Sequence, residues 1–174
     1  MSERVTHTLS PWAEGMPRAL ILGTMPSPKS RERGMYYGHP QNRFWKTLAA
    51  LWQEEVPCTP EEARDFAFRH RIALWDVLAE CDIRGASDAS IAHPRANDIK
   101  ALLERCPVST IFTTGKKAQE LYNALVLPRT GKPAVALPSP SAANRARWTD
   151  DQLVIAYAKV YETCEDAGDD LQQR

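Results

Sequence analysis

The sequence predicts an α/β protein, a three-layer α/β/α sandwich with a central four-stranded parallel sheet. Short apolar runs rich in branched residues alternate along the chain with longer amphipathic stretches, which is typical of βαβ units around a parallel sheet. The length of 174 residues suits one domain rather than two. With 43% hydrophobic and 25% charged residues, the composition is that of an ordinary globular protein, which excludes a disordered or fibrous chain.

The elements can be assigned in chain order from their residue types. The four expected strands cover residues 19–23, 72–77, 108–113 and 134–137. Helix starts are marked by Thr59 and Thr149, each followed three residues later by a Glu or Gln that can complete a capping box. An apolar face that includes Phe44, Trp45 and Leu48 predicts a further helix. The expected helices cover residues 43–53, 60–70, 98–105, 116–125 and 149–163.

Composition divides the chain into three parts. We expect residues 1–17 to be an N-terminal leader, residues 18–164 to be the domain, and residues 165–174 to be an acidic, disordered tail. No run approaches the roughly 18 apolar residues of a membrane helix, and the first residues lack the apolar core of a signal peptide. A cytoplasmic protein without a membrane partner is therefore expected.

The cysteines give no sign of a metal centre. Cys58, Cys81, Cys106 and Cys164 lie far apart and form no Cys-x-x-Cys pair, which disfavours zinc and iron–sulfur clusters. Reduced thiols are the simpler interpretation. We expect neither a metal nor a cofactor.

Two loops stand out because each follows the end of an expected strand. They cover residues 24–41 and 138–148. In an open α/β sheet, ligands bind in the crevice outside the carboxyl ends of the strands. The two loops are therefore the predicted binding site.

The motifs in these loops resemble the signature loops of the uracil-DNA glycosylase superfamily. The first loop contains Gly-x-x-Pro-Ser at residues 23–27 and leads into His-Pro-x-Asn-Arg-Phe-Trp at residues 39–45; the second contains Pro-Ser-Pro-Ser at residues 138–141. The resemblance covers roughly residues 18–160. It is closest to the hypoxanthine-DNA (deoxyinosine) glycosylase branch, which is related to the mismatch-specific uracil/thymine glycosylases. It implies an enzyme that flips a base out of DNA and hydrolyses its N-glycosidic bond.

The resemblance implies that Asn42 is the catalytic residue. In most of the superfamily the third residue of the first motif is an Asn or Asp that positions or activates the water, but Met25 stands there and can do neither. In the hypoxanthine branch the asparagine of the His-Pro-x-Asn segment takes over. Asn42 would orient the water through its side-chain carbonyl. Asparagine is also among the best residues to open a helix, and the two roles are compatible.

A base-binding pocket is implied in the same way. Tyr37 stands at the family's place for the aromatic residue that stacks on the flipped base, although it could instead anchor the loop to the core. His39 could donate to the leaving base or to a phosphate. The other implied base-binding residues are Gly23, Thr24, Met25 and Asp88, and turn formation explains Asp88 equally well. Leu137 replaces the histidine of the family's second motif, which weighs against efficient uracil removal.

Contacts to the DNA backbone are expected from the turns of both loops, because exposed backbone N–H groups and hydroxyls bind phosphates. The expected DNA-binding residues are Ser27, Ser30, Ser139, Ser141, Ala143, Asn144 and Arg145. The tip formed by residues 142–145 occupies the place of the wedge that fills the hole left by the flipped base. This tip is small, and Arg145 is the group most suited to contact DNA.

The net charge is zero, from 22 basic and 22 acidic residues, but it is unevenly divided along the chain. Residues 1–50 carry +4, residues 51–110 carry −4, residues 111–147 carry +5 and residues 148–174 carry −5. The two positive segments contain the two loops, so we expect a basic DNA-binding face with salt-dependent affinity. The basic residues expected there are Lys29, Arg31, Arg33, Arg43, Lys46, Lys116, Lys117, Arg129, Lys132, Arg145 and Arg147.

The favoured function is a monofunctional, monomeric DNA glycosylase of base-excision repair that removes a deaminated base, hypoxanthine first. No lysine stands at a matched catalytic position, so a Schiff-base lyase step is not expected. One alternative is a uracil or mismatch glycosylase of the same superfamily. The other is a non-catalytic DNA- or nucleotide-binding module on the same fold, which Met25 favours and Asn42 opposes.

Overall fold

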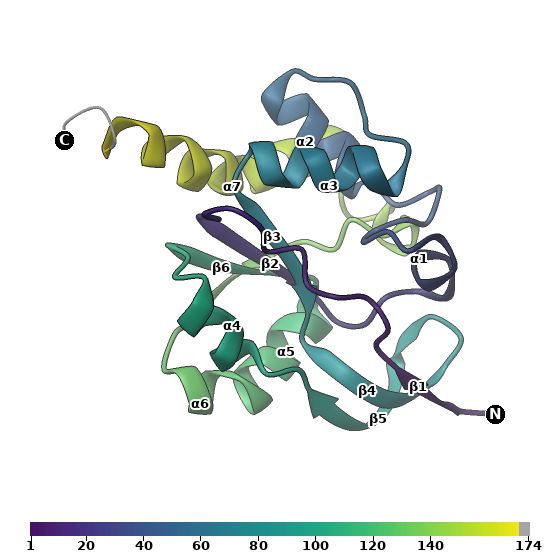
Figure 1. Cartoon of the computed structure of the whole chain (residues 1–174). Helices are drawn as coiled ribbons and strands as arrows, with labels where there is room; N and C mark the ends of the chain where they lie inside the picture. The colour runs from purple at the N-terminus through teal and green to yellow at the C-terminus, as the bar shows by residue number, and fades with distance from the viewer. Residues whose placement is uncertain (171–174) are drawn as a thin grey trace.

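Four parallel strands form the centre of the computed structural model, which describes residues 1–170 (Figure 1). In sheet order they are β3 (Ile72–Asp76), β2 (Ala19–Gly23), β6 (Thr110–Thr114) and β7 (Ala134–Leu137). Every neighbouring pair is parallel. The predicted fold class is therefore confirmed, and all four expected strands form.

These strands are apolar because both faces of the sheet are covered. In β2 the side chains of Ala19 and Ile21 belong to one core cluster, and those of Leu20 and Leu22 belong to another. All four residues are 0% exposed. Successive side chains of a strand point to opposite faces, so a strand buried on both faces leaves no place for alternating polar residues.

Helices form a layer on each face of this sheet (Figure 1). One face is covered by α2 (Phe44–Trp52), α3 (Pro60–Arg69) and α7 (Asp150–Asp170). The other is covered by α4 (Ile99–Arg105), α5 (Lys116–Leu125) and the short α6 (Leu127–Thr130). Both capping signals act as predicted, since the hydroxyls of Thr59 and Thr149 accept backbone N–H groups three residues later.

The second sheet is not predicted by the sequence. It is antiparallel, with the order β1-β4-β5, and comprises β1 (Glu3–Thr6), β4 (Leu78–Arg84) and β5 (Ser87–Ala96). No side chain of β5 is fully buried, so apolar alternation does not mark this strand.

Residues 1–17 belong to the fold, so the prediction of a leader outside the domain is wrong. Strand β1 pairs with β4, and Val5 is buried. The backbone N–H and C=O of Trp12 are both hydrogen-bonded to Leu74 of β3, at 2.9 and 2.8 Å. These pairings join segments that are far apart in the sequence, and local residue patterns do not reveal such contacts.

The predicted acidic tail begins inside α7, which extends to Asp170; residues 171–174 lie outside the described residues. Cys164 is buried, and Nε1 of Trp52 donates a hydrogen bond to Glu165 at 2.9 Å. The packing of the helix therefore runs past its predicted end.

None of the helices in residues 1–170 is long and apolar enough to cross a membrane.

Both predicted binding loops follow the carboxyl ends of parallel strands. The loop after β2 contains α1 (Pro28–Arg33), and the loop after β7 contains the short 3-10 helix η1 (Ala142–Asn144). Strands β3 and β6 lie on opposite sides of β2, so the strand order reverses there. Such a switch point opens a crevice at the carboxyl ends of the strands.

Candidate active site

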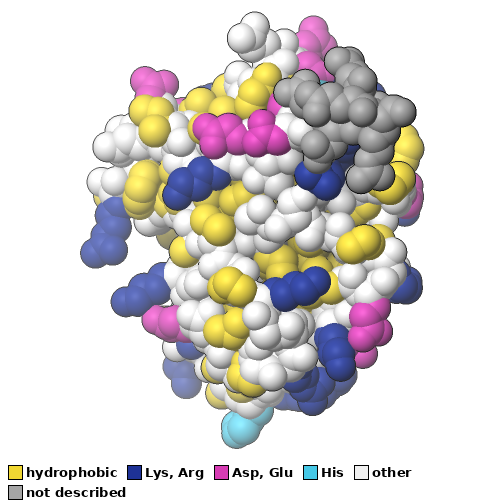
Figure 2. All heavy atoms as spheres, turned by 90° about the vertical axis from the view of Figure 1, so that its left-hand side faces the viewer, with side chains coloured by type: hydrophobic (Ala, Val, Ile, Leu, Met, Phe, Trp, Pro, Cys, Tyr) yellow, Lys and Arg dark blue, Asp and Glu magenta, His cyan; other side chains and the backbone are white. Residues whose placement is uncertain are grey.

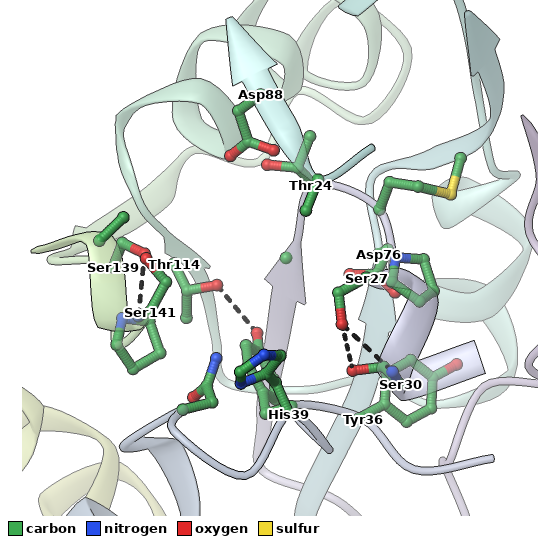
Figure 3. A pocket seen from close by; sticks show the side chains of 18 of the residues that line it. Thr24, Ser27, Ser30, Tyr36, His39, Asp76, Asp88, Thr114, Ser139 and Ser141 are labelled. Carbon is green, nitrogen blue, oxygen red and sulfur yellow. Dashed lines mark hydrogen bonds between the residues drawn. The ribbon is translucent and has the colours of Figure 1, made fainter. Parts of the chain in front are cut away.

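A cavity of about 320 Å³ opens at this crevice (Figure 3). Its walls come from the ends of β2, β3 and β6, from both loops, and from the β4–β5 hairpin. The predicted site residues that line it are Gly23, Thr24, Met25, Ser27, Ser30, Tyr37, His39, Asn42, Asp88, Ser139, Ser141 and Ala143. Asn144 and Arg145 lie in the second loop but outside the cavity lining.

The floor of the cavity is packed so closely that residue 23 has to be glycine. A Cβ atom there would lie 2.5 Å from Oδ1 of Asp76 and 3.3 Å from the hydroxyl of Tyr37. The hydroxyl of Thr114 lies 3.6 Å from the same point. The end of β2 therefore leaves room for three polar side chains that line the cavity.

Tyr37 forms a fixed aromatic wall. Its ring stacks on the buried ring of Phe44, with centroids 3.8 Å apart and 14° between the planes. Its hydroxyl lies 2.9 Å from Oγ1 of Thr114 (Figure 3). Burial and the negative charge of Asp76 raise the pKa of Tyr37, so the phenol stays neutral. Because Phe44 covers one face of the ring, the opposite face is the surface on which a flat ligand can stack.

Asn42 lies in the cavity wall with a defined amide orientation. Its Oδ1 accepts the backbone N–H of Phe44 at 2.9 Å and closes a turn just before α2; the N-cap position is Arg43, so the interpretation of Asn42 as the N-cap is wrong. Because an N–H only donates, the amide oxygen has to be the atom on that side. The second lone pair of Oδ1 remains for a ligand or water, as does Nδ2, which has no hydrogen-bonded acceptor in residues 1–170.

His39 lies at the cavity with one ring nitrogen engaged. Its Nδ1 accepts the backbone N–H of Gln41 at 3.1 Å. In a neutral ring the proton is then on Nε2, which can donate to a ligand. Since His39 is exposed, it can meet both the contents of the cavity and solvent.

Met25 and Thr24 form an inert part of the wall. Met25 packs against the apolar cluster that includes Leu20 and Leu22, and its thioether is only a weak acceptor. It is therefore unsuited to position a water, as the sequence indicates. Thr24 is buried, and its carbonyl accepts the backbone N–H of Leu78 at 3.1 Å.

The serines of the first loop hold the loop together. Ser27 caps α1 through the backbone N–H of Ser30, at 3.1 Å, and its hydroxyl donates to that of Ser30 (Figure 3). The hydroxyl of Ser30 accepts the backbone N–H of Gly38 at 3.0 Å, and Ser30 is 3% exposed. The prediction that Ser30 contacts DNA is therefore wrong, because its hydroxyl is buried and engaged. Ser27 is half-buried at the cavity.

The second loop is braced from within. Oγ of Ser139 accepts the backbone N–H of Ser141 at 3.3 Å, and Nδ2 of Asn144 donates to the carbonyl of Ser139 at 2.9 Å. Ala143 and Arg145 are exposed near its tip. The tip therefore presents a small apolar side chain and one cation on a fixed backbone.

Arg43 joins the two loops and is not a surface residue. Its backbone N–H donates to the carbonyl of Pro140 at 3.0 Å, and its guanidinium donates to the carbonyl of Trp148 at 2.6 Å and to Asp150 at 3.3 Å. The side chain is 4% exposed. Arg43 therefore fixes the spacing of the loops, and its expected place on a basic DNA-binding face is wrong.

Other cations also lie away from the cavity. Arg129 is in α6 and Lys132 lies two residues before the start of β7, so both lie toward the amino ends of the parallel strands, opposite the cavity. The guanidinium of Arg33 is bonded to backbone carbonyls. Figure 2 shows the left-hand side of Figure 1, which is the side away from α1 and the β4–β5 hairpin; there, Lys and Arg side chains are interspersed with acidic and apolar ones. The expected basic face therefore loses Arg33, Arg43, Arg129 and Lys132, whereas Arg31 lies in the cavity wall and Arg145 is exposed.

Asp88 belongs to the β4–β5 hairpin, and its carboxyl group faces the cavity although the residue as a whole is exposed (Figure 3). Desolvation raises the pKa of Asp88; the charge of Lys117 opposes this, and that of Asp76 adds to it. Asp88 is therefore more readily protonated than an ordinary aspartate, and can then donate as well as accept.

Three residues of the site escape prediction from the sequence: Asp76, His7 and Thr114. Asp76 ends β3, is 5% exposed and lines the cavity. Nε2 of His7 lies 2.8 Å from its Oδ2, a contact across 69 positions. A polar residue next to the carboxyl end of an expected strand is a signal that could have found Asp76. In residues 1–170 no group of three or more His, Cys, Asp or Glu side chains could hold a metal ion.

Comparison with known proteins gives concordant matches. The sequence model of the Uracil DNA glycosylase superfamily matches residues 13–160. Two proteins named Hypoxanthine DNA glycosylase, from Methanosarcina acetivorans and Methanosarcina barkeri, are 37% and 34% identical over 128 residues, which is 72% of this chain and 80% of each relative. A solution NMR structure of a Methanosarcina acetivorans protein, provisionally assigned as a uracil DNA glycosylase, has a TM-score of 0.77 and 29% identity, covering 91% of this chain and 98% of that chain.

Proposed function

The chain belongs to the uracil DNA glycosylase superfamily, and from this membership we propose that it is a DNA glycosylase of the hypoxanthine type. Its substrate is deoxyinosine in DNA, and its reaction is hydrolysis of the bond between hypoxanthine and deoxyribose. The relatives named Hypoxanthine DNA glycosylase support the choice of base. One observation carries the proposal: a single cavity combines an aromatic wall backed by the core, Tyr37, with an amide of fixed orientation, Asn42.

The base has to leave the duplex before it can be hydrolysed, because its glycosidic bond is out of reach inside the stack. Tyr37 provides the surface on which the flipped base stacks, an interaction worth about 1–3 kcal/mol. Phe44 supports the ring from behind. The cost of ordering this platform is therefore met during folding and not during base binding.

In the reaction the C1′–N9 bond breaks and both of its electrons leave with the base, while the oxygen of a water molecule bonds to C1′. Asn42 accepts a hydrogen bond from this water through the free lone pair of Oδ1. An amide does not take up a proton at neutral pH, so Asn42 contributes placement of the water and not proton abstraction. The water releases its proton to solvent.

The departing hypoxanthine carries negative charge until it takes up a proton. His39 is the exposed donor at the cavity, and its Nε2–H stabilises that charge. Asp88 contacts the base from the hairpin, where its raised pKa favours a protonated carboxyl that can donate. Among the described residues that line the cavity there is no lysine, which supports hydrolysis without a Schiff-base lyase step.

The DNA strand runs across the edges of the two loops. Ser139 and Ser141 provide hydroxyl groups for phosphates, and Ser27 provides its backbone N–H group at the first loop. Arg145 pairs with a phosphate near the tip of the second loop. Ala143 is small enough to enter the space that the flipped base leaves, and Asn144 holds the tip through its bond to Ser139.

Single-turnover release of free base from duplex oligonucleotides tests this proposal. The duplexes carry hypoxanthine, uracil, xanthine or a thymine mismatch at the same position, and the free base is separated chromatographically. We expect hypoxanthine to be released fastest. Faster release of uracil or thymine would indicate a uracil or mismatch glycosylase. Binding of all four duplexes with no release would indicate a non-catalytic module.

A further inference from the structure

We infer that His7 and Asp76 form a buried pair that recognises the N1–H group of hypoxanthine and rejects adenine. This role presupposes the proposed function, because it specifies which atom of the base the cavity recognises. It assigns to the N-terminal segment, which precedes the family's motifs in the sequence, a part in base specificity.

Asp76 presents one carboxylate oxygen to the cavity. Its Oδ2 is bound by His7 at 2.8 Å, whereas no donor in residues 1–170 is hydrogen-bonded to Oδ1. Oδ1 lies at the floor, 2.5 Å from where a Cβ atom of residue 23 would be. A ligand that fills the cavity and displaces water from this oxygen leaves it in an unfavourable state unless the ligand supplies a donor. A ligand that brings an N–H group to this oxygen would satisfy it.

His7 determines what this carboxylate can do. Its Nδ1 accepts the backbone N–H of Leu9 at 3.2 Å, so the proton of the neutral ring is on Nε2 and is donated to Asp76. The His7 side chain is 3% exposed, and its ring lies 6.2 Å from that of Tyr36. The backbone of residue 9 thus fixes the tautomer of the histidine, and Asp76 is left as an acceptor only.

The segment that carries His7 is anchored beside the central sheet. The backbone N–H of His7 donates to the carbonyl of Ala79 at 2.7 Å, and the hydroxyl of Tyr36 donates to the carbonyl of Ser10 at 2.8 Å. The ring of His7 therefore cannot turn away from Asp76 without losing its bond to the N–H of Leu9, and the segment cannot move away without losing the bond to Ala79. Such restraint is what a precise hydrogen-bonding group requires.

Deamination of adenine changes the very atom that such an acceptor would contact. Adenine has a lone pair at N1, whereas hypoxanthine has an N1–H group. A carboxylate accepts the N–H of hypoxanthine but meets the lone pair of adenine with its own. Sites that depend on a buried hydrogen bond reject strongly the analogue that lacks the partner group. Uracil also has a ring N–H, so the pair excludes the normal purine and does not choose among deaminated bases.

Three substitutions separate this role from a structural one. Asp76→Asn keeps the shape of the side chain but can donate as well as accept. His7→Leu removes the donor to Asp76, and His7→Gln keeps an N–H donor in a side chain of similar length. Single-turnover release is measured from matched duplexes that carry hypoxanthine or unsubstituted purine, whose N1 is an acceptor as in adenine. The ratio of the two rates, compared between variants, cancels the intrinsic reactivity of each base.

We expect the preference for hypoxanthine to fall at least about tenfold in Asp76→Asn, as for loss of one hydrogen bond to a charged group. It should fall similarly in His7→Leu and stay within about threefold of wild type in His7→Gln. In the Asp76→Asn background His7→Leu should change the ratio little, because His7 acts through Asp76.

If a folded Asp76→Asn variant keeps the wild-type preference for hypoxanthine, the inference is wrong. The proposed function still stands in that case, because the wild type releases hypoxanthine. A wild type that releases no hypoxanthine would instead refute the proposed function. If Asp76→Asn does not fold, the two His7 variants decide. An equal loss of rate on both bases in His7→Leu, with no recovery in His7→Gln, would show that His7 is only structural.

Discussion

Single residues of the candidate site combine a structural bond with a free hydrogen-bonding atom. Asn42 engages one lone pair of Oδ1 with a backbone N–H, and His39 does the same with Nδ1. Both keep another atom free for a ligand. Because the engaged atom fixes the orientation of the free one, the site is ordered before any ligand enters. This double use also explains why the turn-forming role of Asn42 does not compete with a catalytic one.

Substitution of Tyr37 separates stacking from loop anchoring. Tyr37→Phe keeps the ring on Phe44 and loses the hydroxyl bond to Thr114, so we expect near-normal base release and a stability loss of about 0.5–1.5 kcal/mol. Tyr37→Ala removes the platform, and base release should fall about 5- to 150-fold, equivalent to about 1–3 kcal/mol. Single-turnover kinetics and thermal melting check both variants. If Tyr37→Phe and Tyr37→Ala release the base equally fast, the role of Tyr37 is purely structural.

The part of the site that the sequence predicts consists of contiguous motifs. Tyr37, Asn42 and the Pro-Ser turns can be recognised because each lies in a short segment of characteristic order. His7 and Asp76 escape because their contact joins residues 69 positions apart. The engagement of Ser30 and Arg43 escapes for a related reason, since burial depends on how the loops fold over each other.

Among the elements, those that carry their own burial pattern are the predictable ones. Strands β2, β3, β6 and β7 are apolar runs, and α2 and α3 have one apolar face each. Strand β5 is mostly exposed and contains Pro94, a residue that argues against a strand. Strand β1 is short and acquires its partner only through the distant β4. A second sheet held by such pairings cannot be inferred from local periodicity.

The end of β2 leaves no room for a methyl group at residue 23. In Gly23→Ala the new Cβ would lie 2.5 Å from Oδ1 of Asp76, so the carboxylate has to move. We expect a stability loss of about 1–3 kcal/mol and a marked fall in base release. Gly34→Ala is the control: its Cβ meets no atom within 4 Å, but its φ of 64° makes alanine strained. If both variants lose activity only in proportion to stability, the close packing at Gly23 has no role in the site.

The three-stranded sheet has an acid-sensitive ion pair. Arg95 and Arg4, each with a nitrogen 2.8 Å from Glu80, lower the pKa of Glu80 from its ordinary 4.5 to about 2. A carboxylate whose pKa is lower in the folded state contributes stability above its unfolded pKa and loses it as the pH falls toward the folded value. The difference in unfolding free energy between wild type and Glu80→Gln should therefore be constant above pH 4.5 and shrink between 4.5 and about 2. Urea unfolding at several pH values checks this; a pH-independent difference would contradict it.

For the molecule as a whole, the zero net charge conceals a division of cations between two ends of the sheet. Arg145 is exposed beside the cavity, whereas Lys132 lies two residues before β7, at the opposite end of the parallel strands. Arg145→Glu should weaken binding to duplex DNA and lower the slope of log affinity against log salt by about 1. Lys132→Glu makes the same change in net charge and should have little effect. Fluorescence anisotropy at several salt concentrations measures both; equal weakening would indicate attraction by net charge alone.

The most direct test of the proposed reaction is single-turnover hypoxanthine release by the wild type, Asn42→Ala and Asn42→Ser. Serine can keep the turn bond to the N–H of Phe44 but is too short to hold the water, so it should retain the roughly 1 kcal/mol of stability that alanine loses. We predict that the wild type releases hypoxanthine and that both variants are slower by about 10²–10³, whatever their stability. No release by the wild type, or wild-type rates in Asn42→Ser, would contradict this.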